Sequence, residues 1–369
     1  MENLRKVDVL IVGAGPAGST CGCLLKQAGV DCLVVDLATF PRDKVCGGVL
    51  SPKAWHLLEK LFPDLKYEFR PVTHIHLDVD GSTCEFDMEE PARLVSRKKF
   101  DHALLQYYQS LGGAFMKGSF QTVEETPSEL IVTLKSGERI ACRYLVGADG
   151  SNSAVRRYLT PKQGFRVLAM EQYVPKAEHE TLDLGLSQSY GTGGYYYRFS
   201  SLDHDIVGFG DNETTPERYR QVLTEKGIPV EKPRGAYIYL SIDYPLNDRI
   251  ILIGDAGGFA NRVTCEGLYD AFQTATNAVK AITTGKPFRE VNAHVFSKIR
   301  TQEKFARFFF SKFSFFVMKI MCNAPGFLKW CVDTQHVLSL PILCWLAVHT
   351  AIWARSRIQR RDLTLRQIL

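Results

Sequence analysis

A glycine-rich turn near the N-terminus constrains the fold of this chain more than any other feature. Residues 7–29 read VDVLIVGAGPAGSTCGCLLKQAG, which predicts a strand buried on both faces, a tight turn and a helix. Gly13 permits the turn, Gly15 lets a phosphate approach the backbone, and Gly18 lets the helix pack on the strand. The N–H groups at such a helix start attract a pyrophosphate. The segment therefore predicts a parallel α/β sheet that binds a dinucleotide.

An acidic residue in the next predicted strand supports dinucleotide binding. The apolar run CLVVD (32–36) ends in Asp36, 18 residues after Gly18. A carboxylate at this separation typically accepts hydrogen bonds from the hydroxyls of a ribose. The glycine motif and this aspartate do not by themselves distinguish FAD from NAD.

Two later segments repeat the pattern of an apolar strand that ends in small residues and an aspartate. The first is RYLVGADGSNSAVRRYL (143–159), with Asp149, and the second is RIILIGDAGG (249–258), with Asp255. Either aspartate alone would more often be a helix cap or a turn residue. Three such motifs in this order predict one FAD molecule held along its length, with ribityl or ribose hydroxyls at Asp255.

The segment after this second aspartate is predicted to become helical near Leu268. N–H groups at the start of that helix would meet the pyrimidine edge of the flavin, where negative charge collects on reduction. The FAD contacts predicted from the motifs are Gly13, Gly15, Ala17, Gly18, Asp36, Asp149, Gly254, Asp255, Gly267 and Leu268.

The three motifs resemble the signatures of group A flavoprotein monooxygenases and their relatives, which share the para-hydroxybenzoate hydroxylase fold. The resemblance implies an α/β protein with a Rossmann-like FAD-binding domain of the GR2 type, a β-sheet-rich substrate domain and a C-terminal helical region. The FAD-binding domain is predicted at residues 1–70, 92–160 and 245–290, the substrate domain at 71–91 and 161–244, and the apolar and basic helical region at 291–369. Arg97 matches an arginine that the family places near FAD, although the cluster Arg97-Lys98-Lys99 would also suit a solvated face.

A cysteine-containing loop narrows the resemblance to one branch. FPRDKVCGGVLSPKAW (40–55) is similar to the loop of geranylgeranyl reductases in which Cys-Gly-Gly runs to a serine at the flavin. The matching residues here are Cys46, Gly47, Gly48 and Ser51. The two glycines permit close approach of the backbone to a planar ring. The thiol of Cys46 could act chemically or pack inertly under the flavin.

The segment after Gly254-Asp255 resembles the corresponding segment of the geranylgeranyl reductases. Gly257-Gly258-Phe259 and NRVTCEG (261–267) resemble its Ala-Ala-Gly-Phe and Asn-Pro-x-Thr-Gly-Glu-Gly, with Cys265 in place of a glycine. The histidine that hydroxylases usually carry near Gly258 does not occur, nor does the Trp-x-Trp-x-Ile-Pro motif of flavin halogenases. Whether Cys46 and Cys265 approach closely enough for a redox bridge stays open.

An aromatic strand provides the third similarity. GGYYYRFSSLDHDIVGFG (193–210) resembles the reductases' Tyr-x-Trp-x-Phe-Pro followed by Gly-x-Gly, with Tyr197 for the tryptophan and Ser200 for the proline. Alternation along a strand puts Tyr195, Tyr197 and Phe199 on one face. That face would line a tunnel for a polyprenyl chain or belong to an ordinary aromatic core. The candidate catalytic groups, as proton donors, are Cys46, Tyr195 and Tyr197.

The resemblance implies an FAD-dependent oxidoreductase that reduces C=C bonds of an isoprenoid-like lipid. Reduced flavin would transfer the hydride, with NAD(P)H or another reductant as electron donor. One alternative is an FAD-dependent monooxygenase that uses NAD(P)H and O2, because the same fold hosts both reactions. The other is a membrane-associated flavin redox or binding protein without a lipid substrate of its own. No metal site is predicted, since the cysteines lack zinc spacing.

The C-terminal part is basic and apolar. Residues 286–369 hold 14 Lys and Arg against 4 Asp and Glu, a net +10, whereas the rest of the chain is −5. Such flanks beside aromatic helices suit peripheral association with an anionic membrane. The apolar run 337–354 contains Pro341 and is short for a span of about 20 residues, so a transmembrane helix and an internal helical core are the alternatives.

Partners and location follow from the same composition. No basic-aromatic module of a nucleic-acid-binding type occurs, so the expected partner is an apolar small molecule rather than nucleic acid. The first apolar run carries Asp8 and leads directly into Gly13, which does not suit a secretory signal. We therefore expect a cytoplasmic protein, at the inner face of a membrane if it binds one.

Overall fold

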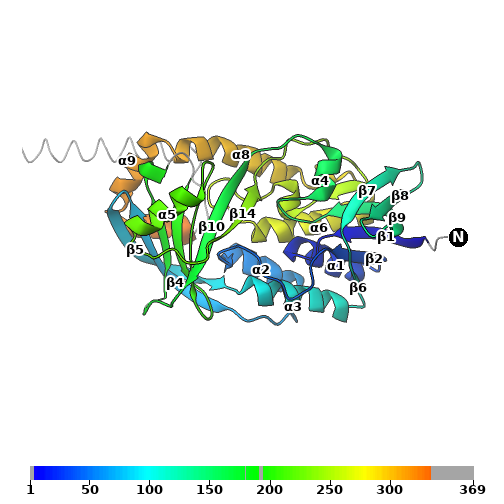
Figure 1. The fold of residues 1–369 in the computed structure, drawn as a ribbon, viewed down its shortest axis with the longest axis horizontal. Helices are drawn as coiled ribbons and strands as arrows, with labels where there is room; N and C mark the ends of the chain where they lie inside the picture. The colour runs from blue at the N-terminus through cyan, green and yellow to red at the C-terminus, as the bar shows by residue number, and fades with distance from the viewer. Residues whose placement is uncertain (1–3, 179, 191–193, 334–369) are drawn as a thin grey trace, which may run out of the picture.

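The computed structural model describes residues 4–178, 180–190 and 194–333. Two β-sheets lie side by side along the length of the molecule, with helices packed around the first sheet and along one side of both (Figure 1). The predicted α/β architecture is confirmed. The apolar run 337–354 lies outside the described residues.

The first sheet is built around the predicted N-terminal strand. Its order is β6-β2-β1-β9-β8-β7, and β15 pairs with β9. The pairs β1–β2, β1–β9, β2–β6 and β9–β15 are parallel, whereas β7, β8 and β9 pair antiparallel. The strands are β1 (Arg5–Val12), β2 (Cys32–Asp36), β6 (Ala114–Lys117), β7 (Phe120–Glu125), β8 (Leu130–Leu134), β9 (Arg139–Gly147) and β15 (Ile250–Leu252).

Strand β1 is buried on both faces, as its continuous apolar run predicts. Val9 and Ile11 pack into one hydrophobic cluster, and Leu10 and Val12 pack into another on the opposite face. The first cluster receives side chains from α1 (Pro16–Gln27), α2 (Pro52–Leu61), α3 (Arg97–Ser110) and α6 (Leu268–Thr284), and also from the C-terminal helices described below. The short helix α4 (Ala154–Leu159) follows β9 on the other side.

The second sheet has eight strands in the order β14-β10-β13-β12-β11-β4-β5-β3. All neighbours are antiparallel except β4 and β11. Its strands are β3 (Val49–Leu50), β4 (Arg70–Val79), β5 (Ser82–Leu94), β10 (Arg166–Val174), β11 (Leu182–Leu186), β12 (Tyr195–Ser200), β13 (Asp205–Asp211) and β14 (Arg234–Tyr239). Strand β5 thus continues beyond the predicted boundary at residue 91, where it pairs with β3 from the cysteine loop.

One face of this sheet is closed by its own small core. Helix α5 (Pro216–Glu225) places Tyr219, Val222 and Leu223 against Tyr196 and Phe209 of the sheet. The opposite face of the sheet therefore remains available for the site described below.

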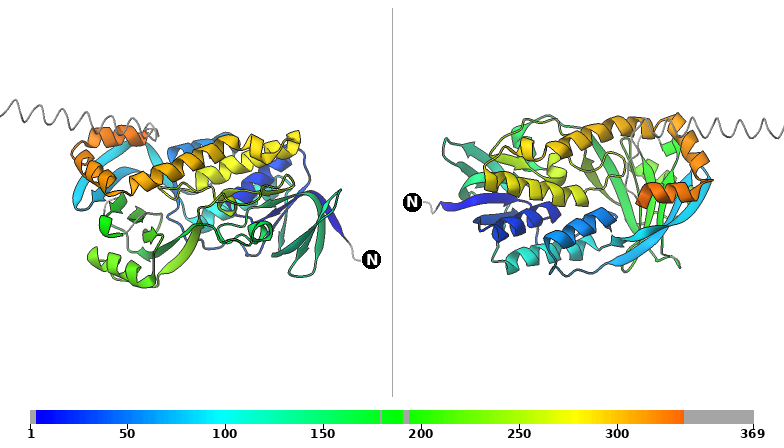
Figure 2. Two further views of the ribbon diagram at one scale, coloured as in Figure 1. Left: turned by 90° about the horizontal axis from the view of Figure 1, so that it is seen from above. Right: turned by 180° about the vertical axis from the view of Figure 1, so that it is seen from behind.

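The C-terminal helices run from the first sheet to the second (Figure 2). They are α7 (Phe288–Val291), α8 (Ala293–Phe309), α9 (Lys312–Met321) and α10 (Pro325–Asp333). Phe296 and Ile299 of α8 join the core of the first sheet, whereas Phe315 and Met318 of α9 pack on Val79 of the second. Within the described ranges, no helix combines the length and apolar character needed to cross a bilayer.

Candidate active site

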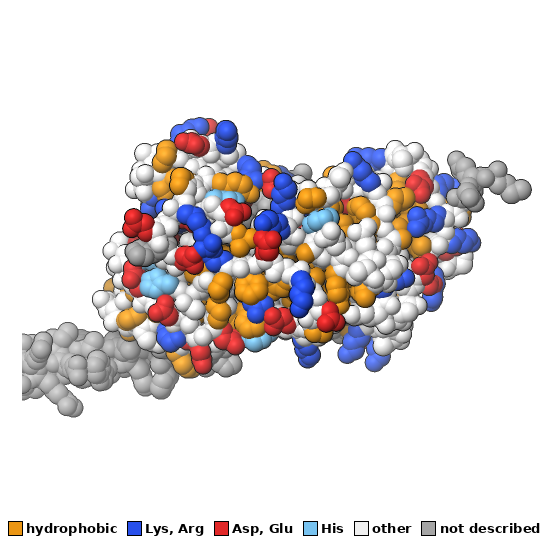
Figure 3. All heavy atoms as spheres, turned by 90° about the horizontal axis from the view of Figure 1, so that it is seen from below, with side chains coloured by type: hydrophobic (Ala, Val, Ile, Leu, Met, Phe, Trp, Pro, Cys, Tyr) orange, Lys and Arg blue, Asp and Glu red, His pale blue; other side chains and the backbone are white. Residues whose placement is uncertain are grey.

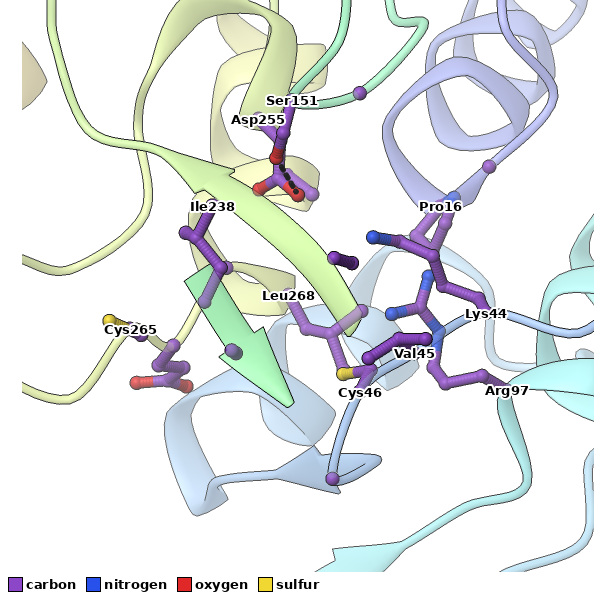
Figure 4. A pocket seen from close by; sticks show the side chains of 18 of the residues that line it. Pro16, Lys44, Val45, Cys46, Arg97, Ser151, Ile238, Asp255, Cys265 and Leu268 are labelled. Carbon is purple, nitrogen blue, oxygen red and sulfur yellow. Dashed lines mark hydrogen bonds between the residues drawn. The ribbon is translucent and has the colours of Figure 1, made fainter. Parts of the chain in front are cut away.

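A cavity of about 1530 Å³ is lined by residues of both sheets. One part borders the glycine-rich turn, and another borders the free face of the second sheet. Figure 4 shows Arg97 and Cys46 at one side of the pocket, with Asp255 and Ser151 at another. The predicted residues that line it are Gly13, Gly15, Ala17, Asp36, Cys46, Gly47, Gly48, Arg97, Asp149, Tyr195, Tyr197, Asp255, Gly267 and Leu268.

Gly18 and Gly254 do not line the cavity but shape the backbone beneath it. A Cβ on Gly18 would lie 1.8 Å from the carbonyl oxygen of Gly13, so only glycine lets α1 start this close to β1. Gly254 has φ +55° and approaches Ala17. Gly13 has φ +109°, and a Cβ there would lie 2.3 Å from the carbonyl oxygen of Ala148. The turn therefore brings the open N-terminus of α1 to the cavity.

Asp36 connects the end of β2 to this turn. Its Oδ2 accepts a hydrogen bond of 2.7 Å from the backbone N–H of Ala14, and its Oδ1 accepts one of 2.8 Å from Ala38. Each carboxylate oxygen has a second acceptor direction. The side chain can therefore hold the turn and still accept a hydroxyl from a ligand in the cavity.

Asp149 presents an unpaired acceptor at the cavity. Its Oδ2 accepts the N–H groups of Ala154 and Val155 at 2.6 and 3.3 Å, which fixes the start of α4. Its Oδ1 is buried and has no partner in the protein, and burial raises the pKa of this carboxyl. A buried oxygen without a partner costs free energy, so a hydroxyl of a bound nucleotide would suit this position.

Asp255 borders the cavity next to Ser151, in the short 3-10 helix η2 (Gly254–Gly257) before α6. Its Oδ2 is 3.4 Å from the hydroxyl of Ser151, the contact dashed in Figure 4. A Cβ on Gly267 would lie 2.9 Å from Oδ1 of Asp255. Helix α6 begins at Leu268, as predicted, and directs its N-terminus toward this carboxylate.

Two arginines beside the turn are held by one buried carboxylate. Asp101 has no exposed side-chain surface, and it accepts hydrogen bonds of 2.8 and 2.9 Å from Arg97. Arg42 approaches the same carboxylate at 3.2 Å, and its guanidinium would lie 3.3 Å from a Cβ on Gly15. The alternative of a solvated Arg97 is wrong, because its side chain is only 9% exposed.

Burial lowers the pKa of Arg97, but Asp101 and then Cys46 outweigh burial and raise it. Both guanidinium groups lie near the N-terminus of α1, where Arg42 comes closest to Gly15. Sequence reasoning missed Arg42, because it stands in the charged run Arg42-Asp43-Lys44, which looks like an exposed loop. Its position in the cysteine loop, which was already predicted to lie at the flavin, could have identified Arg42 as a site residue.

The cysteine loop lies against the aromatic face of β12. A Cβ on Gly47 would be 2.6 Å from the ring of Phe199, and Gly48 has φ +70° with Val95 behind it. The backbone N–H of Cys46 donates to Oε1 of Glu171 at 3.2 Å. The close packing explains both glycines and places the thiol in the cavity.

The loop around Cys265 is tied to the cysteine loop by an acidic side chain. Glu266 contacts the hydroxyl of Ser51 and lies 2.7 Å from Nζ of Lys53. Cys265 occupies a left-handed conformation with φ +55°, which is unusual for a residue with a side chain. Cys46 and Cys265 are both free thiols, so no bridge joins them in this structure.

The aromatic side chains of β12 have defined partners. The hydroxyl of Tyr195 donates to the carbonyl oxygen of Thr264 at 2.6 Å, and the hydroxyl of Tyr197 donates to Oε2 of Glu171 at 3.1 Å. The rings of Tyr197 and Phe199 stack with centroids 4.8 Å apart. These side chains line the cavity, whereas the sheet core on the opposite face takes Tyr196.

The rest of the second-sheet wall is apolar. Aliphatic side chains from four strands alternate toward the cavity, and two phenylalanines of α8 and its end join them. They are Ile75, Leu77, Leu182, Leu184, Leu186, Val167, Ala169, Ile238, Phe309 and Phe310. Such a wall suits an elongated apolar ligand. In the described part of the chain, no cluster of potential metal ligands occurs.

Comparisons with known proteins match this chain to FAD-binding proteins and to a structure of the same fold. Residues 6–181 match the FAD binding domain family. An uncharacterised protein of Methanosarcina barkeri is 28% identical over 327 residues, covering 83% of this chain and 81% of that protein. The menaquinone reductase of Mycolicibacterium smegmatis is 27% identical over 320 residues, covering 76% and 77%. A geranylgeranyl bacteriochlorophyll reductase-like protein of Thermoplasma acidophilum shares the fold, with a TM-score of 0.72 and 18% identity over 94% of this chain and 96% of that one.

Proposed function

Because this chain belongs to the FAD-dependent oxidoreductases of the geranylgeranyl reductase family, we propose that it reduces carbon–carbon double bonds of an isoprenoid or polyprenyl lipid. FAD is its cofactor. The name of the mycobacterial relative, a menaquinone reductase, supports a substrate that carries a polyprenyl chain.

One observation carries the proposal: a single cavity joins the polar cradle around the glycine turn to the apolar wall of the second sheet. An isolated alkene is unactivated, so an enzyme must align it and exclude water. The stacked rings of Tyr197 and Phe199 and the aliphatic residues beyond them would hold a polyprenyl chain in such a dry position.

The polar residues fit a bound FAD. Asp36 and the unpaired Oδ1 of Asp149 would accept hydroxyls, Arg42 and Arg97 would face the pyrophosphate, and the N-terminus of α6 would face the flavin ring. When bound and reduced by NAD(P)H or another donor, FAD supplies the hydride. The residues of this chain bind and orient both partners.

Anaerobic reoxidation tests this function. The FAD-loaded protein is reduced in the absence of oxygen, polyprenyl lipids are added, and flavin absorbance and lipid mass are followed. We expect reoxidation with a gain of two hydrogen atoms for each bond reduced. Reoxidation that requires oxygen and adds an oxygen atom to the lipid would identify a monooxygenase. A reduced flavin that no lipid reoxidises would favour a flavin protein without a lipid substrate.

We also propose that α9 rests on an anionic membrane. Phe313, Phe316 and Ile320 are 53%, 61% and 50% exposed and recur on one helical face. Arg307 in the last turn of α8 and Lys312 at the start of α9 are exposed, and among the described residues neither forms an ion pair. The face seen from below in Figure 3 instead intersperses basic and acidic side chains.

The position of this helix fits lipid delivery, because Phe309 and Phe310, just before α9, line the cavity. Co-sedimentation with vesicles tests the contact. We expect the full chain to bind vesicles that contain phosphatidylglycerol, less so at high salt, and the double variant F313S/F316S to lose most binding. Phe165→Ser removes a phenylalanine of similar exposure, 55%, from the position just before β10 and is the control. Equal binding by all three proteins would exclude α9 as the contact.

A further inference from the structure

A buried carboxylate lies in the cavity wall, at a position that the sequence motifs do not mark. Glu171 of β10 has no exposed surface and lines the cavity. Its Oε1 accepts hydrogen bonds of 3.2 Å from the backbone N–H of Cys46 and from Arg234, and its Oε2 accepts one of 3.1 Å from the hydroxyl of Tyr197. Burial of a carboxylate is costly even when it is paired, which points to a role beyond packing.

The sheet brings Glu171 and Tyr197 together across an intervening strand. Glu171 pairs with Gly208 of β13, and Gly208 pairs in turn with Tyr197 of β12. A Cβ on Gly208 would lie 2.1 Å from Cζ and 2.2 Å from the hydroxyl of Tyr197. The missing side chain at Gly208 therefore lets the tyrosine ring lie across β13 and reach the carboxylate.

The surroundings of the pair favour the protonated form of both members. Burial has the largest effect on Glu171 and raises its pKa. The hydrogen bond from the Cys46 N–H, the charge of Arg234 and the hydrogen bond from Tyr197 lower the pKa, in decreasing order of effect. Burial, followed by the charge of Glu171, raises the pKa of Tyr197 well above its usual value. The other titratable or charged groups facing the pair are Lys44, Cys46, Tyr195, Tyr219 and Arg234.

The contacts separate the three candidate proton donors. Tyr195 donates to the Thr264 carbonyl, which cannot return a proton. Cys46 contacts the Gly48 N–H and Arg97, and neither group releases a proton at neutral pH. Only Tyr197 has a titratable carboxyl behind its hydroxyl. That carboxyl leads outward to Arg234, whose side chain is 29% exposed.

We infer that Tyr197 and Glu171 deliver the proton that completes saturation of the double bond; this rests on the proposed function. The alkene electron pair forms a C–H bond with the Tyr197 proton, and the Tyr197 O–H bond breaks. When bound and reduced, FAD would supply the hydride for the other carbon. The proton of the Glu171 carboxyl moves to the tyrosine oxygen, and water beside Arg234 restores it. Tyr197 is the catalytic residue, and Glu171 is a positioning residue that acts through it.

Three variants test this pair in the reduced, FAD-loaded full chain: Glu171→Gln, Tyr197→Phe and, as control, Tyr196→Phe, which changes the neighbouring tyrosine on the opposite face of β12. General acid catalysis contributes roughly 100-fold or more. We expect the first two to slow anaerobic reoxidation by lipid about 100-fold and the double variant to be no slower than either. Tyr196→Phe should keep nearly the wild-type rate, because this side chain packs in the sheet core away from the cavity. FAD binding, measured by flavin fluorescence, should be unchanged in all of them.

A spectroscopic readout tests the pair without turnover. Infrared titration of the protein should detect a protonated buried carboxyl that persists above the pH at which a free glutamate ionises, and Glu171→Gln should remove that band. The carboxyls of Asp149 and Asp270, whose pKa values burial also raises, are present in both proteins. Carboxyl bands that are the same in the wild type and in Glu171→Gln, or variants that keep the wild-type reoxidation rate, would overturn the inference. Failure of the wild-type protein to react with any lipid would instead overturn the proposed function.

Discussion

The guanidinium of Arg97 and the carboxylate of Asp101 form two parallel hydrogen bonds, of 2.8 and 2.9 Å, one helical turn apart on α3. Asp101 is fully buried and also approaches Arg42 from the cysteine loop. One carboxylate thus orients two arginines beside the N-terminus of α1. Bidentate pairs of this kind fix geometry as well as charge, and the position of both arginines depends on Asp101.

Replacement of Asp101 by asparagine tests this dependence. An amide oxygen cannot compensate two buried guanidinium groups, so we expect FAD affinity to fall roughly 10- to 100-fold and stability to fall by about 3 kcal/mol. Flavin fluorescence titration and denaturant unfolding measure the two effects. The control is Glu68→Gln, which removes the exposed ion-pair partner of Lys99, a residue of α3 like Asp101. It should lower the free energy of unfolding by less than about 1 kcal/mol. Wild-type affinity in the Asp101→Asn variant would exclude the arginines from FAD binding.

Gly208 is expected to tolerate no side chain. Alanine there would place its Cβ 2.1 Å from the ring of Tyr197, and overpacking of this kind costs about 1–3 kcal/mol. Gly235 of β14 is the matched control, because its Cβ would meet other atoms only at 3.4 Å or more. Denaturant unfolding of the two alanine variants should separate them clearly. Equal stability of the two variants would mean that the Tyr197 ring can move away from residue 208 without a loss in the free energy of unfolding.

Cys265 carries backbone strain that glycine would relieve. Its φ of +55° costs a residue with a side chain roughly 1 kcal/mol or more. We expect Cys265→Gly to raise the free energy of unfolding by about 1 kcal/mol. Cys265→Ala keeps the strain and should bring no gain. If thermal unfolding ranks the alanine variant above the glycine variant, side-chain contacts rather than backbone conformation decide stability here.

The raised pKa of Glu171 has a pH signature. Because burial favours its protonated form in the folded state, the stability it contributes is complete below the unfolded pKa of about 4.3 and is lost as pH rises through the folded pKa. Glu171→Gln cannot ionise. The unfolding free energy of the variant minus that of the wild type should therefore become more positive as pH rises from about 4.

Denaturant unfolding of both proteins at a series of pH values measures this difference. Burial also raises the pKa of Asp149 and Asp270, which are present in both proteins and cancel in the comparison. A flat difference would show that the pKa of Glu171 is the same in the folded and unfolded protein, and a difference that decreases with pH would show that folding favours its ionised form.

Local motifs were sufficient to predict four strands of the first sheet, β1, β2, β9 and β15, but not β6, β7 and β8. The strand, turn and helix around Gly13 and Gly18 are specified by neighbouring residues, since the glycines act on backbone atoms within a few positions of themselves. The start of α6 at Leu268 could be predicted for the same reason. The family resemblance added the discontinuous order of the two sheets, which no local pattern contains.

By itself, then, the sequence determined a dinucleotide cradle and an aromatic strand, because glycine conformation and strand alternation are properties of short segments. Only the tertiary structure placed the carboxylate of Glu171 between the cysteine loop and the aromatic strand. Cys46 and Glu171 are separated by 125 residues, and Tyr197 reaches Glu171 only across Gly208. A buried carboxylate looks like any other acid in a sequence. It acquires its raised pKa and its partners only when distant strands exclude water from it.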